Sequence, residues 1–183
     1  MIIENERKYI LSSEIENRLV DVPYYWIKQA YLPSVNNIAY RLREVTKNKV
    51  KRIFTIKSRN VDGTNTEIEF PVEKEDFDAL FSKADRFVNK RRHIVDHLSG
   101  TWEIDVFLDS EGKSYFWMAE IELPEHQTEP TSLPDIIKEY LIYEVPLTDG
   151  RFSSRKVSSI KYATKLLKHL KGNRHEKAVS VRA

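Results

Sequence analysis

The sequence contains no cysteine. The chain can therefore form no disulfide, hold no metal ion through thiolates and use no cysteine nucleophile. It also lacks any apolar run of about 18 residues, the length that a membrane-spanning helix requires. The first residues lead at once into a charged segment, so we expect no signal peptide, no membrane partner and a cytoplasmic location.

An excess of charge of one sign is missing as well. The 30 Lys and Arg residues nearly balance the 28 Asp and Glu residues, which gives a formal net charge of +2. Such a balance produces no strong field of the kind that draws a protein to nucleic acid, so we expect no nucleic-acid partner. The histidines show no metal-ligand spacing and are interpreted as surface or incidental residues: His93, His97, His126, His169 and His175.

The 183 residues suit a single domain with a substantial core. We expect this domain to cover residues 1–172, including a basic C-terminal helix, and residues 173–183 to form a polar tail. Charged residues make up 32% of the chain. That fraction is high, as expected if part of the interior is ionic.

The N-terminal segment 3–9 reads Ile-Glu-Asn-Glu-Arg-Lys-Tyr. In a β-strand successive side chains alternate between faces, so Glu4, Glu6 and Lys8 would share one face. Two carboxylates at this spacing repel each other unless something compensates them. A divalent cation with a polyanion bound beside it would do so. The alternative is a solvated face of an edge strand, where charges discourage aggregation.

The same alternation recurs in five further segments. Six strands that each carry a charged face are explained better by one shared polar interior than by six unrelated faces exposed to solvent. The alternating pairs are Arg41 and Arg43, Thr55 and Lys57, Glu67 and Glu69, Glu103 and Asp105, and Glu120 and Glu122.

The pattern as a whole predicts an α+β protein that is mainly antiparallel β, a barrel with helical additions. The turn at 109–112, Asp-Ser-Glu-Gly, predicts a hairpin between two strong strands. Strands are expected near 2–10, 38–46, 51–59, 65–72, 101–108, 115–123 and 140–147. Helices are expected near 12–20, 74–84, 132–140 and 157–171.

These motifs together resemble the CYTH superfamily, the triphosphate tunnel metalloenzymes, over residues 3–155. The N-terminal Glu-x-Glu-x-Lys resembles the family signature, although Ala30 replaces a family glycine in Gln29-Ala30-Tyr31-Leu32. The further matches, in chain order, are Arg41-Leu42-Arg43, Thr55-Ile56-Lys57, Glu67-Ile68-Glu69, Lys90-Arg91-Arg92, residues 102–107, residues 119–123 and Asp149-Gly150-Arg151-Phe152-Ser153.

The resemblance implies an eight-stranded closed β-barrel, a triphosphate tunnel with peripheral and C-terminal helices. It also implies Mg²⁺ or Mn²⁺, and these hard cations prefer the carboxylate oxygens in which the sequence is rich. The implied metal ligands are Glu4, Glu6, Asp105, Glu120 and Glu122. The implied phosphate-binding residues are Lys8, Arg41, Arg43, Lys57, Lys90, Arg92 and Arg151. The implied catalytic residues are Glu67, Glu69 and Tyr31.

The expected activity is metal-dependent hydrolysis of inorganic triphosphate or a nucleoside triphosphate, by a monomer or homodimer. A class IV adenylate cyclase, a thiamine triphosphatase and a non-catalytic polyphosphate-binding module stay open as alternatives. The paired glutamates argue against the binding module, because an anion binder gains nothing from extra negative charge.

Several aromatic and basic residues have structural interpretations. Residues 24–26, Tyr-Tyr-Trp, are expected to form a packed cap at one tunnel mouth rather than a base-stacking platform. Trp102 and Trp117 are expected to pack outward beneath helices. Arg91 is expected to point away from Lys90 and Arg92, into solvent.

Overall fold

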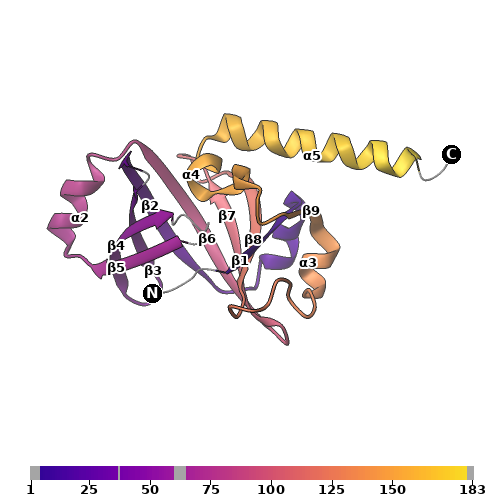
Figure 1. Ribbon diagram of the computed structural model, residues 1–183, viewed down its shortest axis with the longest axis horizontal. Coiled ribbons are helices and arrows are strands. Elements are labelled where there is room, and N and C mark those ends of the chain that lie inside the picture. Colours follow the sequence, from indigo (N-terminus) through magenta and orange to yellow (C-terminus); the bar gives the residue numbers. More distant parts are fainter. Residues whose placement is uncertain (1–4, 37, 60–64, 181–183) are drawn as a thin grey trace.

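The computed structural model describes residues 5–36, 38–59 and 65–180. They form one nine-stranded sheet in which every neighbouring pair is antiparallel (Figure 1). The order across the sheet is β5 (Asn65–Pro71), β4 (Val50–Arg59), β3 (Ile38–Thr46), β2 (Tyr24–Val35), β6 (Arg86–His97), β7 (Gly100–Leu108), β8 (Ser114–Glu122), β1 (Glu6–Leu11) and β9 (Leu141–Val145).

Helices cover the sheet at three places. In Figure 1, α2 (Lys74–Phe81) lies at the end of the molecule that holds β3, β4 and β5, and α5 (Ile160–Ser180) runs across the top of the view, above the part that holds β7, β8 and β9. In the described part of the chain, no helix is both long enough and apolar enough to cross a membrane. The helices are η1 (Ser13–Ile15), α1 (Glu16–Leu19), α2 (Lys74–Phe81), α3 (Asp135–Tyr140), η2 (Gly150–Phe152), α4 (Ser154–Val157) and α5 (Ile160–Ser180).

The expected mainly antiparallel α+β class is confirmed, and the 109–112 hairpin is present. Asp109 Oδ1 accepts hydrogen bonds from the backbone N–H groups of Glu111 (2.9 Å) and Lys113 (2.8 Å). Gly112 takes a φ of +80°, which glycine adopts without the strain that a side chain would bring. The turn residues therefore fix this connection locally.

The sequence pattern missed two of the longest strands, β2 and β6. In β2 apolar residues fall on both faces and Pro33 lies near the end, so the period of two is hidden. In β6 the consecutive basic residues 90–92 break the alternation.

The expected packed cap of aromatic residues at 24–26 is wrong. Tyr24 and Trp26 lie within β2, and 40% and 48% of their surfaces are exposed.

The expectation of a closed, eight-stranded barrel is also wrong, because the described strands are not closed into a ring by hydrogen bonds. Among the strands that the structure describes, β5 and β9 end the order, so hydrogen bonds do not join the two edges. Alternation tells which residues share a face. It does not determine strand number and stagger, and these decide whether a sheet closes.

The two faces of the sheet have separate apolar cores. On the outer face Trp102 and Trp117 pack with Ile15, Leu19 and Ile137 from η1, α1 and α3, which confirms that both tryptophans lie beneath helices. Near the other end of the sheet, α2 buries Phe77 against Ala30 and Leu42. Burying each large apolar side chain contributes about 1.5–3 kcal/mol.

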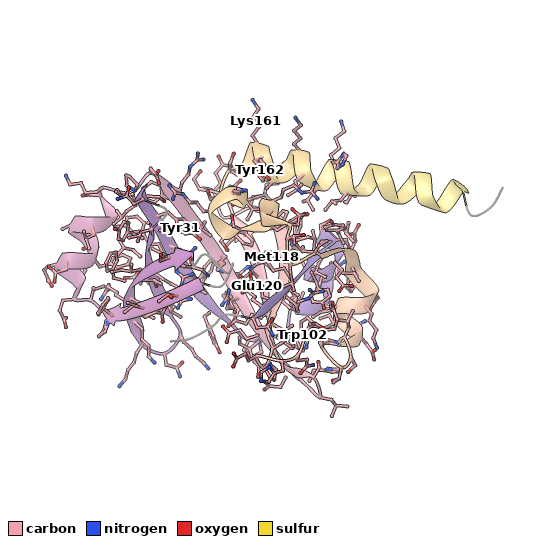
Figure 2. All side chains as sticks on the ribbon, viewed as in Figure 1. Tyr31, Trp102, Met118, Glu120, Lys161 and Tyr162 are labelled. Atoms are coloured by element: carbon pink, nitrogen blue, oxygen red, sulfur yellow. The ribbon has the colours of Figure 1, made fainter. Side chains whose placement is uncertain are left out.

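The inner face is apolar at one end only. There Ile10, Phe107 and Met118 pack against residues of η2, α4 and α5, including Phe152 and Leu166. Figure 2 shows Met118 and Glu120 near each other in the middle of the molecule. The C-terminal helices thus cover one end of this face and leave the neighbouring stretch to polar side chains.

Candidate functional site

The strand register places charged residues from seven strands, and Gln29 from β2, on the inner face. Residues opposite each other on antiparallel strands project to the same side, so the pairs can be followed from strand to strand. The facing pairs are Lys57 and Glu67, Thr55 and Glu69, Arg41 and Thr55, Gln29 and Arg43, Arg92 and Asp105, Glu103 and Glu120, Lys8 and Glu120, and Glu6 and Glu122.

The first group on this face surrounds Lys8. Its ammonium group contacts the carboxylates of both Glu6 and Glu120. Burial opposes the charge on Lys8, but Glu120 and Glu6 together raise its pKa above the ordinary value. Glu122 is exposed at the end of β8, opposite Glu6. Glu4, the remaining predicted metal ligand of the N-terminal strand, lies outside the described residues.

The second group is centred on Asp105, which is fully buried. Arg92 binds it in bidentate fashion, Nε to Oδ1 at 2.6 Å and Nη2 to Oδ2 at 2.6 Å, and Lys90 contacts Oδ2. Burial alone would raise the pKa of Asp105, yet Arg92 and Lys90 hold it below the ordinary value. Asp105 is therefore ionised and fully engaged by its two cations.

Arg92 links this group to the first. Its Nη2 donates to Glu120 Oε2 at 3.1 Å, and its Nη1 contacts Glu103. Burial would raise the pKa of Glu120, but Lys8, Lys90 and Arg92 lower it. The sequence pattern placed Glu103 in an alternating pair with Asp105, but Glu103 was not predicted as a site residue.

The third group forms a basic wall on β3 and β4. Arg41 Nη2 donates to Glu67 Oε1 at 2.7 Å and to Glu69 Oε1 at 3.3 Å. Arg43 Nη2 donates to the same Glu69 oxygen at 3.1 Å. Lys57 Nζ lies 3.6 Å from Glu67 Oε2. The predicted phosphate-binding residues of β3 and β4 thus contact the predicted catalytic glutamates of β5.

Tyr31 lies on the inner face between these groups. It is buried, its hydroxyl accepts a hydrogen bond from Gln29 Nε2 at 2.6 Å, and Arg41, Glu120 and Lys8 all influence its ionisation. Burial raises the pKa of this hydroxyl, so Tyr31 keeps its proton and has it available to donate. Gln29 was not predicted as a site residue, although the Gln29-Ala30-Tyr31-Leu32 motif contains it.

Two basic residues lie away from the inner-face groups. Arg151 is exposed in η2, where its guanidinium binds Asp149 Oδ1 through Nε (2.8 Å) and Oδ2 through Nη2 (2.6 Å). Arg91 projects to the outer face as expected, but its Nη2 pairs with Glu16 Oε2 at 2.8 Å instead of extending into solvent. One expected surface histidine, His93, is in fact buried beside the Val22 carbonyl.

The carboxylates of the inner face are oxygen donors that suit a hard divalent cation. Within residues 5–36, 38–59 and 65–180, no three His, Cys, Asp or Glu side chains already stand close enough together to hold a metal ion. These carboxylates are paired with cations instead of being gathered around a common point. Lys8 contacts both Glu6 and Glu120, and Lys90 and Arg92 contact Asp105.

The fold is that of the CYTH proteins, as comparison with solved structures establishes. The inorganic triphosphatase NE1496 is 22% identical to this chain, with a TM-score of 0.56 over 86% of this chain and 95% of that one. A candidate adenylate cyclase from Bacillus halodurans is 20% identical, with a TM-score of 0.56 over 82% and 98%. A candidate adenylyl cyclase from Hippeastrum with a dominant triphosphatase activity is 14% identical, with a TM-score of 0.51 over 68% and 80%.

The structural neighbours are thus CYTH-family proteins, which confirms the resemblance seen in the sequence motifs. No protein-family model and no curated protein sequence matches the chain.

Proposed function

We propose that this protein is a metal-dependent phosphohydrolase that cleaves inorganic triphosphate or a nucleoside triphosphate. The observation that carries the proposal is that one face of the sheet holds both a carboxylate cluster (Glu6, Glu120 and Glu122) and the basic wall. A triphosphate with a divalent cation carries both signs of charge and is long enough to reach both groups. Two of the similar structures are also named for triphosphatase activity.

The basic wall would bind the phosphate chain. Arg41 and Arg43 have planar guanidinium groups that can donate two hydrogen bonds to one phosphate, while Lys57 supplies a point charge. Lys8 lies at the carboxylate cluster and would contact the phosphate nearest to the cation. These four cations would orient the chain and offset the charge that develops on the transferred phosphoryl group.

The carboxylate cluster would hold Mg²⁺ or Mn²⁺ through Glu6, Glu120 and Glu122, together with Glu4 of the N-terminal signature. When bound, the cation would supply positive charge beside the phosphate oxygens and lower the pKa of the attacking water. Asp105 fits this role poorly, because it is fully buried and Arg92 and Lys90 take up both of its oxygens. Lys8 and Arg92 contact the two oxygens of Glu120, but Lys8 would turn to the bound phosphate and release one of them. We assign Asp105, Lys90 and Arg92 to holding Glu120 in place.

Tyr31 would donate a hydrogen bond to a phosphate oxygen, since the raised pKa of its hydroxyl keeps the proton on it. Glu67 would hold Arg41 and Lys57 in position. Arg151 would reach the phosphate only after it releases Asp149, so we place it outside the binding site proper.

The cyclase alternative uses the same triphosphate site, and two similar structures carry that name. The experiment that separates the possibilities is incubation of the purified protein with tripolyphosphate, ATP or thiamine triphosphate, each with Mg²⁺ or Mn²⁺, followed by separation of the products. We expect orthophosphate, and its loss when EDTA removes the cation. Cyclic AMP with pyrophosphate would identify a cyclase, and an unchanged triphosphate would leave a binding module.

A further inference from the structure

Three hydrogen-bond donors of the basic wall converge on one oxygen of Glu69. Arg41 Nη2, Arg43 Nη2 and Thr55 Oγ1 lie 3.3, 3.1 and 3.0 Å from Glu69 Oε1. Cationic and hydroxyl donors gathered around a single anionic oxygen also form the environment that proteins provide for a phosphate oxygen. Glu69 Oε1 therefore marks an anion-binding position.

The donors and the carboxylate differ in how firmly the fold holds them. Thr55 is fully buried, and the side chains of Arg41 and Arg43 are only 21% and 20% exposed. Glu69 is 40% exposed and belongs to β5, an edge strand that pairs only with β4 among the described strands. The carboxylate can thus turn into solvent while the donors stay in place.

The two arginines also have donor capacity that Glu69 does not use. Arg41 Nε and Arg43 Nε are buried and have no hydrogen-bond partner within the described part of the chain. A buried donor without a partner is unfavourable, so a ligand that satisfies it binds more tightly. A phosphate group offers more acceptor oxygens than one carboxylate, and can bind these Nε atoms as well as the donors now held by Glu69.

We propose that Glu69 is a built-in competitor that occupies a phosphate-oxygen position and must leave when a triphosphate binds. This inference rests on the proposed function, in which the basic wall binds the phosphate chain. Glu69 then lowers the apparent affinity, because only molecules with the carboxylate displaced can accept the ligand. Anions too short to gain other contacts on the inner face are disfavoured by the same competition.

The chain offers a matched control on the opposite face of the same strands. Glu44 Oε2 accepts a hydrogen bond from Arg52 Nε at 2.7 Å, and this pair links β3 and β4 as the Glu69 contacts link the basic wall to β5. Glu44 has the same charge as Glu69 but projects to the outer face. Replacing it changes the net charge equally without touching the inner face.

The test is the dissociation constant of a methylene-bridged triphosphate analogue, which resists hydrolysis, measured by titration calorimetry in the presence of Mg²⁺. Wild type, Glu69→Gln, Glu69→Ala and Glu44→Gln are compared. The two Glu69 variants should bind about threefold to tenfold more tightly, the range expected when a partly exposed competing ion pair is removed. Glu44→Gln should bind like the wild type.

Unchanged or weaker binding by Glu69→Gln and Glu69→Ala, with a wild type that binds, would overturn only this inference and make Glu69 a residue that positions the arginines. If neither the wild type nor the variants bind the analogue with Mg²⁺, the proposed function fails and the inference falls with it. Binding by the Glu69 variants but not by the wild type would support the inference in its strongest form.

Discussion

Asp105 shows how single residues of the inner face can carry charge in a buried place. Removing a carboxylate from water is costly, and the cost is offset only where cations and hydrogen bonds satisfy its oxygens. Arg92 and Lys90 do this for Asp105. These three side chains form one unit. Loss of the Asp105 carboxylate removes the acceptor of the buried Lys90 ammonium and leaves Arg92 paired with Glu103 and Glu120.

We therefore expect Asp105→Asn to lower the free energy of unfolding by about 3–5 kcal/mol, the usual cost of breaking a buried ion pair. Urea denaturation measures this change. Asp96→Asn, an exposed position on the adjoining strand β6, should stay within about 0.5 kcal/mol of the wild type. A loss below about 1 kcal/mol in Asp105→Asn would contradict the role assigned to this buried unit.

Glu122 differs from Asp105 because it is exposed and lies at the end of its strand. Glu122→Gln should reduce the cation-dependent activity at least about tenfold, since the cation loses a charged oxygen ligand. The midpoint of urea denaturation should not fall. Glu125→Gln, an exposed neighbour in the following loop, is the control and should keep full activity. Full activity in folded Glu122→Gln would remove Glu122 from the metal site.

At the scale of the strands, the sequence predicted which residues share a face better than it predicted which strands exist. Alternation identified Arg41 and Arg43 on β3, which Leu42 separates, and Glu120 on β8, which lies between Ala119 and Ile121. It could not identify β2, in which apolar residues occupy both faces. Nor could it predict that Glu69 would contact Arg43 two strands away, because strand register depends on contacts distant in sequence.

The two faces of the sheet provide a direct comparison of two arginines. Arg43→Ala should raise the KM for a triphosphate about tenfold to a hundredfold, because it removes a charged hydrogen-bond donor from the inner face. Arg91→Ala removes an equal charge from the outer face, where Arg91 pairs with Glu16. That variant should keep its KM and lose at most about 1 kcal/mol of stability. Steady-state kinetics on both variants would show an error in the assigned faces if their KM values rose equally.

At the scale of the whole molecule, the inner face of the sheet has two parts. One is apolar and is covered by the C-terminal helices, and the other is charged. The apolar part packs beneath η2, α4 and α5, and the charged part extends from β5 to β1. The sequence indicated a shared polar interior and a basic C-terminal helix. It did not predict the open strand order, because the meeting of two edges depends on the curvature of all nine strands together.

The central claim is that the charged part of the inner face binds an extended triphosphate with a divalent cation. The most direct test is the thermal unfolding midpoint with Mg²⁺ and a methylene-bridged triphosphate analogue, which resists hydrolysis, compared with orthophosphate at equal concentration. Binding to the native state should raise the midpoint by about 5 °C or more at about 100 times the dissociation constant. Orthophosphate, which cannot reach both the carboxylate cluster and the basic wall, should raise it far less. Equal shifts from the two ligands would contradict an extended triphosphate site.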